Sequence, residues 1–227
     1  MKKNLAFRPS EYTAMLIQQI RLESARIKGK SALEIGCGSG VVLAALAKEG
    51  AQRVSGVDIE PDAIGVSKQT LGAEGYLDIA DLHTGDMWSV LDGRVFDVIV
   101  ANLPQGPFEK PIPDGRPETW SFGGPDGRAV LDRFLNGLAA HLTVDGWGLI
   151  THFDPIDVAK TIAILQASGF EAKIAMTRLL TYSMDRLNKL APEVVVGRVG
   201  KSIVSYGEYV FAEVHIVEFR RVFAGHE

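Results

Sequence analysis

Leu33-Glu34-Ile35-Gly36-Cys37-Gly38-Ser39-Gly40 is the stretch that decides the fold of this chain. Its apolar start predicts a buried strand, and three glycines at every second position predict a tight turn that leaves no room for side chains. The apolar residues from Val41 to Lys48 predict a helix directly behind the turn. A ligand could therefore lie against bare backbone beside the free N–H groups of a helix N-terminus, an arrangement typical of nucleoside cofactor sites.

A second apolar run ends at Asp58, eighteen residues after Gly40. A carboxylate in this place can accept hydrogen bonds from both hydroxyls of a ribose. Ile59 follows it and is placed to pack against an adenine ring. A glycine turn alone can be a mere helix cap, but Asp58 favours the interpretation as a cofactor site.

The spacing Gly-x-Gly-x-Gly, preceded by Glu34, resembles the S-adenosyl-L-methionine site of the class I, Rossmann-like methyltransferases. A sulfonium cofactor carries no pyrophosphate, and an acid before the turn suits its ammonium group. The resemblance implies one role for each candidate residue. The methionine end would be held by Glu34, Gly36, Gly38 and Gly40, the ribose by Asp58, and the adenine by Ile59, Asp86 and Met87.

Asn102-Leu103-Pro104-Gln105 follows a predicted strand over residues 95–101 and carries the expected chemistry. Methyl transfer from a sulfonium is an in-line displacement, so the acceptor lone pair must lie on the axis of the breaking bond. The Asn102 oxygen and the Leu103 carbonyl can accept the two N–H groups of an amide or amine and stabilise its growing positive charge. Pro104 fixes the backbone that presents this carbonyl. We therefore expect Asn102, Leu103 and Pro104 to be catalytic.

This segment resembles the Asn-Pro-Pro-Tyr motif of glutamine and adenine amino-methyltransferases, whose aromatic residue stacks on the acceptor. Gln105 stands at that position and stacks weakly, so Phe108 or Trp120 would supply the missing face. Residues 122–135, which begin Phe-Gly-Gly-Pro-Asp-Gly-Arg, resemble a segment of the release-factor glutamine methyltransferases. Residues 7–13 resemble the segment before the cofactor domain of that family, which lies across the methionine end. The expected substrate-binding residues are Gln105, Phe108, Trp120 and Thr13.

The resemblance covers residues 7 to about 180, and the separate N-terminal helical domain of that family has no counterpart before it. Alternating helix and strand patterns predict a single α/β domain over 1–227. The expected fold is Rossmann-like and doubly wound, with a seven-stranded, mostly parallel sheet and an antiparallel C-terminal strand. Residues 1–29 form an N-terminal helical segment. Residues 103–125 hold six of the ten prolines and are expected to form a substrate lid.

Residues 183–207 form an insertion before the last strand. It is either a cap on the rim of the site or a solvated connector.

Composition limits the partners. The net charge of −4 and pI near 5.8 disfavour a large nucleic-acid surface. One cysteine provides no disulfide or multi-cysteine metal site, and we expect no metal. No stretch has the length of a signal peptide core or a membrane span, so we expect a cytoplasmic enzyme with no membrane partner.

Four functions remain open at this point. A protein or peptide glutamine side chain is the favoured acceptor. The alternatives are an adenine amino group of nucleic acid, a small molecule, and binding of the cofactor without catalysis. The oligomeric state is open.

Overall fold

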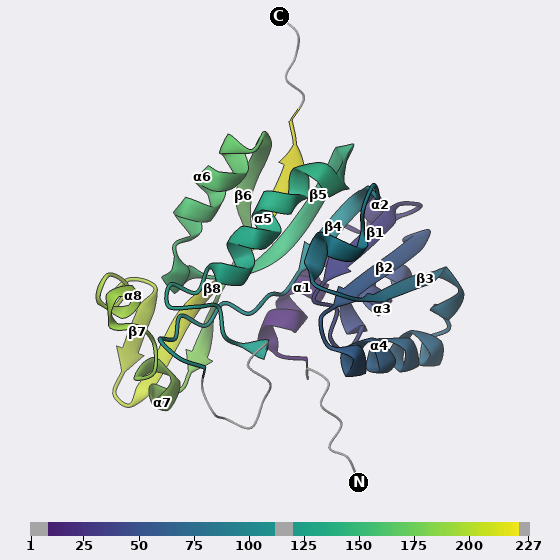
Figure 1. The fold of residues 1–227 in the computed structure, drawn as a ribbon. Coiled ribbons are helices and arrows are strands. Elements are labelled where there is room, and N and C mark those ends of the chain that lie inside the picture. The colour runs from purple at the N-terminus through teal and green to yellow at the C-terminus, as the bar shows by residue number, and fades with distance from the viewer. Residues whose placement is uncertain (1–8, 112–119, 223–227) are drawn as a thin grey trace, which may run out of the picture.

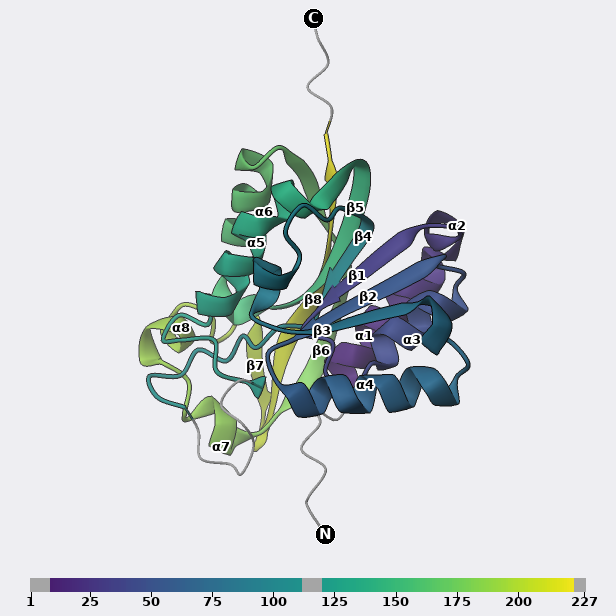
Figure 2. The same ribbon diagram turned by 45° about the vertical axis from the view of Figure 1, so that its right-hand side comes forward.

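The computed structural model describes residues 9–111 and 120–222, which build one mixed β-sheet between two layers of helices (Figures 1 and 2). Its strands are β1 (Ser31–Ile35), β2 (Arg53–Asp58), β3 (Ala80–Thr84), β4 (Phe96–Ala101), β5 (Leu142–Phe153), β6 (Phe170–Tyr182), β7 (Ile203–Tyr206) and β8 (Tyr209–Arg221). Its α-helices are α1 (Glu11–Leu22), α2 (Ser24–Ile27), α3 (Val41–Lys48), α4 (Pro61–Ala73), α5 (Ala129–His141), α6 (Val158–Ala167), α7 (Met184–Leu187) and α8 (Pro192–Val196). The predicted lid lies partly outside the described residues, at 112–119.

The sheet has the strand order β3-β2-β1-β4-β5-β8-β6. The first five strands pair in parallel, whereas β8 pairs antiparallel with both β5 and β6. The predicted fold is therefore confirmed: a doubly wound, mostly parallel sheet with an antiparallel C-terminal strand. The short β7, which the expected seven strands did not include, pairs with β8 as an eighth strand inside the 183–207 insertion.

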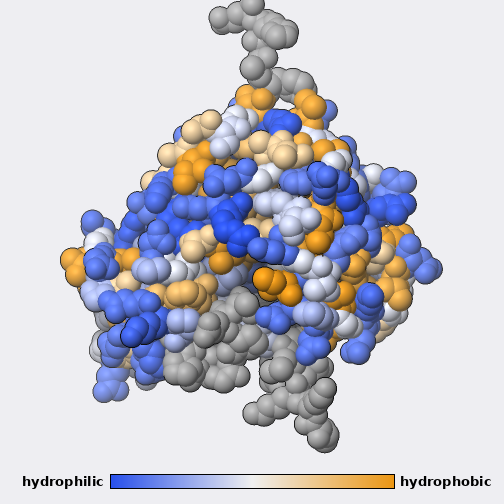
Figure 3. All heavy atoms as spheres, in the orientation of Figure 1, coloured by the Kyte–Doolittle hydropathy of each residue, from blue (hydrophilic) through white to orange (hydrophobic). Residues whose placement is uncertain are grey.

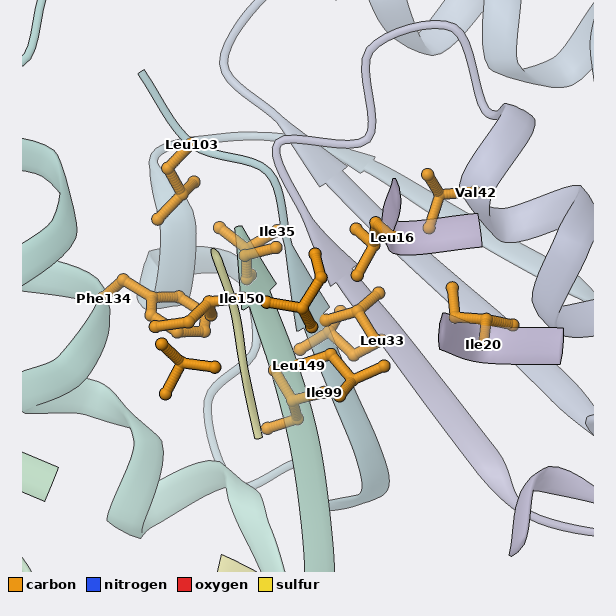
Figure 4. Packing of buried hydrophobic residues seen from close by; sticks show 14 of the residues in the cluster. Leu16, Ile20, Leu33, Ile35, Val42, Ile99, Leu103, Phe134, Leu149 and Ile150 are labelled. Atoms are coloured by element: carbon orange, nitrogen blue, oxygen red, sulfur yellow. The ribbon is translucent and has the colours of Figure 1, made fainter. Parts of the chain in front are cut away.

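Helices cover both faces of the sheet, with α1, α3 and α4 on one face and α5 and α6 on the other (Figures 1 and 2). Figure 4 shows the resulting core, in which Leu16 of α1 and Val42 of α3 lie on one side of the strands and Phe134 of α5 lies on the other. Ile35 and Ile99 of the central strands lie between them, fully or almost fully buried. Burying such side chains is worth roughly 1.5–3 kcal/mol each, which holds the strand ends that carry the site in fixed positions.

Hydrogen bonds and ion pairs connect the 183–207 insertion to the rest of the domain. Some of these contacts lie close in sequence to residues 102–105, which we call the acceptor loop. The backbone N–H of Ala191 donates to the carbonyl of Pro107 at 2.7 Å. The Arg198 guanidinium lies 3.6 Å from an Asp154 oxygen and 3.5 Å from an Asp157 oxygen. None of the described residues of the insertion lines the cavity at the strand ends, so a role of the insertion as a cap on its rim stays a prediction.

Hydrophilic residues dominate the face shown in Figure 3, interrupted by small apolar groups. Within the described part of the chain, no helix combines the length and apolar character needed to cross a bilayer.

Candidate active site

A cavity of about 360 Å³ opens at the carboxyl ends of β1, β2, β3 and β4. The strand order reverses between β1 and β4, and ligands of open α/β sheets bind at this kind of switch point. The volume lies within the range of small-molecule sites. Its lining includes these residues of the predicted site: Thr13, Glu34, Gly36, Gly38, Asp58, Ile59, Asp86, Met87, Asn102, Leu103, Pro104 and Trp120.

Hydrogen bonds from β2 and α4 fix the conformation of the glycine turn, residues 36–40. Asp58 accepts the N–H of Gly38 at 2.8 Å. From the other side, the Ser67 hydroxyl donates to the Gly38 carbonyl at 3.0 Å and the Thr70 hydroxyl donates to the Ser39 carbonyl at 2.7 Å. The turn is therefore a preformed cradle whose backbone needs no rearrangement to receive a ligand.

Gly40 is not part of the lining, which corrects its predicted contact with the methionine end. It is the N-cap of α3 with φ +76°, and a Cβ there would come within 2.8 Å of the Ser67 Cα. Glycine is required at this position by the close packing of α3 against α4. Gly36 and Gly38 have φ +74° and +50° and do face the cavity.

Glu34 brings a buried carboxylate to the cavity wall. Its side chain is 2% exposed, and its Oε2 has no hydrogen-bond partner among the described residues. Burial, with a smaller contribution from the Asp58 charge, raises the pKa of Glu34 well above its ordinary value, although a backbone hydrogen bond at Leu43 opposes this. An unpartnered buried acceptor of this kind is costly unless a donor or cation arrives, so the carboxylate is suited to an ammonium group.

Asp58 does more than the sequence indicates. Besides Gly38, it accepts the N–H of Glu60 at 2.9 Å, so both carboxylate oxygens organise backbone. Burial raises the pKa of Asp58, and the bonds from the two N–H groups counteract this rise. Ile59 and Glu60 line the cavity beside it, with Ile59 52% exposed. Sequence reasoning missed Glu60, although its place two residues after Asp58 at the strand end was an available signal.

The far end of the cavity carries an ion pair. Asp86 lies 2.6 Å from the Arg133 guanidinium of α5, and the Trp88 indole donates to the Arg133 carbonyl at 3.3 Å. Met87 is buried and has φ +50°, in the left-handed region that non-glycine residues rarely adopt. Arg133 and Val130 line the cavity from α5, and no local sequence signal connected that helix with the residues after β3.

Asn102 is held by two hydroxyl groups. The Thr151 hydroxyl of β5 donates to its Oδ1 at 2.7 Å, and its Nδ2 donates to the Thr13 hydroxyl of α1 at 3.3 Å. Leu103 and Pro104 lie beside it on the cavity wall. The three residues predicted to be catalytic therefore lie together, with Thr13 next to them.

Gln105 and Phe108 are placed elsewhere, which corrects their predicted contact with substrate. The Gln105 amide nitrogen donates to the Thr151 carbonyl at 2.7 Å, and its oxygen accepts the Phe153 N–H at 2.8 Å. Gln105 is 8% exposed and Phe108 is 1% exposed, and neither lines the cavity. Gln105 turns inward because β5 offers partners for both ends of its amide, and Phe108 joins the apolar core.

Two aromatic residues from the lid region also belong to the cavity wall. Trp120 and Phe122 both line the cavity, and the role of Trp120 in substrate binding stays a prediction. Phe122 was missed as a site residue, although it begins the Phe-Gly-Gly segment that carries part of the family resemblance.

A separate polar cluster lies among β5, β8 and the insertion. Oxygen or nitrogen atoms of Asp154, Glu213 and His215 approach one another within 4.8 Å. The His215 Nε2 already faces Asp154 at 3.0 Å, and its Nδ1 faces the Thr177 hydroxyl at 2.9 Å. With both ring nitrogens engaged in the protein, this cluster ties strands together rather than presenting open metal ligands.

Comparison with known proteins finds similarity to methyltransferases. Residues 11–117 match the family model described as "Ribosomal protein L11 methyltransferase (PrmA)". A relative from Methanocaldococcus jannaschii, named "Putative protein N5-glutamine methyltransferase", is 31% identical over 170 residues, which are 74% of this chain and 83% of the relative.

Two further matches extend the comparison. The ribosomal protein L11 methyltransferase of Vibrio parahaemolyticus is 31% identical over 135 residues, and the match covers 60% of this chain but only 43% of that protein. The chain thus matches less than half of that relative's length. The crystal structure of a ribosomal protein L11 methylase from Lactobacillus delbrueckii subsp. bulgaricus has the same fold, with a TM-score of 0.58 and 20% identity over 93% of this chain and 81% of that one.

Proposed function

Because the chain belongs to the class I S-adenosylmethionine-dependent methyltransferases, we propose that it methylates a nitrogen atom of a protein, with a glutamine side-chain amide as the favoured acceptor. The observation that carries this proposal is the position of Asn102. Its amide reaches the same cavity as Glu34, Asp58 and Asp86, at the start of the Asn102-Leu103-Pro104 turn. A polar group there would face both a bound cofactor and a planar acceptor.

The cavity fits the cofactor at each end. Bound S-adenosylmethionine would supply an electrophilic methyl group on a sulfonium. Glu34 presents its unpartnered Oε2 for the ammonium group, and the glycine cradle leaves backbone for the methionine end. Asp58, with Glu60 beside it, would accept the ribose hydroxyls, and Asp86 with Met87 would face the adenine against Ile59.

The acceptor nitrogen is oriented by the chain's own carbonyl groups. Asn102 Oδ1 has a second lone pair beyond the one that accepts from Thr151, and the Leu103 carbonyl lies one peptide further along. Two such acceptors would hold the two N–H groups of an amide, turn its lone pair toward the methyl group and stabilise positive charge as the bond forms. The proton on the nitrogen becomes acidic only as the new bond forms and would be released to water, so this mechanism requires no strong base.

Protein acceptors are favoured by the relatives, whose names specify a protein glutamine and a ribosomal protein. Nucleic acid is disfavoured by the acidic net charge of −4. The aromatic wall of Trp120 and Phe122 gives a planar amide a face on which to lie, which Gln105 does not supply.

Incubation with methyl-labelled cofactor and a fractionated lysate tests the proposal. We expect label in protein, recovered as N5-methylglutamine after enzymatic digestion and as labelled methylamine after acid hydrolysis. Asn102→Ala should retain cofactor affinity while turnover falls about 10²-fold or more, since it removes a group that acts in the transition state. Asn136→Ala on the exposed side of α5 is the matched control. Label in nucleic acid or small molecules, or full activity of Asn102→Ala, would contradict the proposal.

A further inference from the structure

The end of β5 and the acceptor loop are joined by a closed set of hydrogen bonds. The Thr151 side chain is bonded to Asn102, and the Thr151 carbonyl is bonded to Gln105, both at 2.7 Å. The Phe153 N–H completes the set by donating to the Gln105 oxygen at 2.8 Å. Residues 102–105 are thereby fixed at both ends to one strand.

We propose that Thr151 is a positioning residue for methyl transfer: its hydroxyl fixes the orientation of the Asn102 amide, and Gln105 fixes Thr151 in turn. This inference rests on the proposed function, because it concerns the group that orients the acceptor nitrogen. Neither Thr151 nor Gln105 lines the cavity, so each acts through Asn102 rather than on the substrate.

The orientation of an asparagine amide matters because its two ends have opposite hydrogen-bonding character. A half-turn of the Asn102 amide would present N–H donors where the acceptor nitrogen needs an oxygen. The 2.7 Å bond from the Thr151 hydroxyl opposes that half-turn by holding Oδ1. Thr13 supports the same orientation, since its hydroxyl accepts from the backbone of Ser10 at 3.2 Å as well as from Asn102 Nδ2.

Burial strengthens this arrangement. Thr151 is 1% exposed, so water does not compete for its hydroxyl, and a hydrogen bond in such surroundings is stronger than at the surface. Loss of the bond would leave the half-buried Asn102 amide oxygen with one donor fewer, at a cost that favours rotation of the amide toward other partners.

Gln105 explains how the loop keeps its shape without an aromatic residue at its fourth position. Its amide bridges two backbone groups of β5 that lie 46 and 48 residues away in the chain. The Leu103 carbonyl lies between the two anchor points, so the second proposed acceptor of the substrate N–H groups is held together with the first.

Three variants test the role by steady-state transfer to the labelled acceptor. Thr151→Val keeps the shape and removes the hydroxyl, and we expect kcat to fall about 10²-fold, since small misplacement of a reacting group has effects of this size. KM for the acceptor and the affinity for S-adenosylhomocysteine should stay unchanged. Thr151→Ser should restore most of kcat, and Gln105→Met should lower kcat without changing cofactor affinity.

Thr143→Val is the matched control, because it makes the same change on the same strand. Its hydroxyl contacts Asp97 at 3.4 Å, away from the cavity. A kcat of Thr151→Val equal to that of Thr143→Val would overturn the inference. A Thr151→Ser variant as slow as Thr151→Val would also overturn it, because packing rather than the hydroxyl would then be responsible.

A spectroscopic measurement decides the geometry without turnover. The side-chain amide pair of Asn102 is assigned in a ¹⁵N–¹H spectrum by its loss in Asn102→Asp. We expect the Nδ2 proton that Thr13 accepts to be protected from solvent exchange in the wild type and in Thr151→Ser and to exchange faster in Thr151→Val, and equal protection in the wild type and Thr151→Val would overturn the inference. If the wild type labels no acceptor, the proposed function fails and the positioning role fails with it. If the wild type transfers and Thr151→Val transfers equally well, only the positioning role fails.

Discussion

Glu34→Gln separates cofactor binding from stability because the native carboxylate is buried without a partner for Oε2. Two opposite charges at about 4 Å attract by about 4 kcal/mol at an effective dielectric near 20. Part of this is offset by desolvation, so we expect the neutral variant to lose about 3 kcal/mol of binding free energy, or about 10²-fold in Kd. In the absence of cofactor, the same change should raise the free energy of unfolding at pH 8 by about 1–3 kcal/mol, because an unsatisfied buried group of high cost is removed.

The pH dependence follows from the raised pKa of Glu34. An acid whose native pKa exceeds its unfolded value contributes stability at low pH that is lost as pH rises through the native pKa. The wild type without cofactor should therefore lose stability over that range relative to Glu34→Gln. We expect cofactor binding to require the ionised carboxylate, so the wild-type Kd should rise as pH falls through the native pKa of Glu34. Below that pKa, binding should release a proton.

Isothermal titration calorimetry in buffers of different ionisation enthalpy measures the Kd and the proton release together, and urea unfolding measures the stability. Glu74→Gln, on an exposed residue at the end of α4, is the matched control and should change neither quantity. Unchanged affinity in Glu34→Gln, or a loss of stability without cofactor at pH 8, would refute the reasoning.

Two further predictions test separate parts of the fold. Gly40→Ala and Gly29→Ala both place a methyl group at φ near +75°, but only at Gly40 would it meet backbone, the Ser67 Cα at 2.8 Å. Urea unfolding should therefore show a loss of about 1 kcal/mol for Gly29→Ala and about 3 kcal/mol for Gly40→Ala, and equal losses would contradict the packing argument. Burial, aided by Arg128, lowers the pKa of His152 to about 3, so the unfolded chain takes up a proton below pH 6.5 that the native state refuses. The free energy of unfolding should therefore fall by about 2 kcal/mol between pH 7 and pH 5. In His152→Gln the urea midpoint should stay nearly constant over that range, and an undiminished fall in this variant would contradict the assignment to His152.

Much of the site could be predicted from sequence because parallel strands bring their carboxyl ends to one edge of a sheet. Glu34, Asp58, Asp86 and Asn102 each stand at or just after a predicted strand, and the structure places all four around one cavity. The alternation of strand and helix patterns likewise predicted the doubly wound, mostly parallel sheet.

Tertiary structure alone decided which way the side chains near these strand ends point. Gln105 turns away from the cavity because β5 supplies partners for both ends of its amide, and Phe108 is drawn into the core. Arg133 meets Asp86 across 47 residues, and Thr151 meets Asn102 across 49. Local sequence determines backbone conformation and strand order, whereas the hydrogen-bond partner of a polar side chain depends on which distant segment is packed beside it.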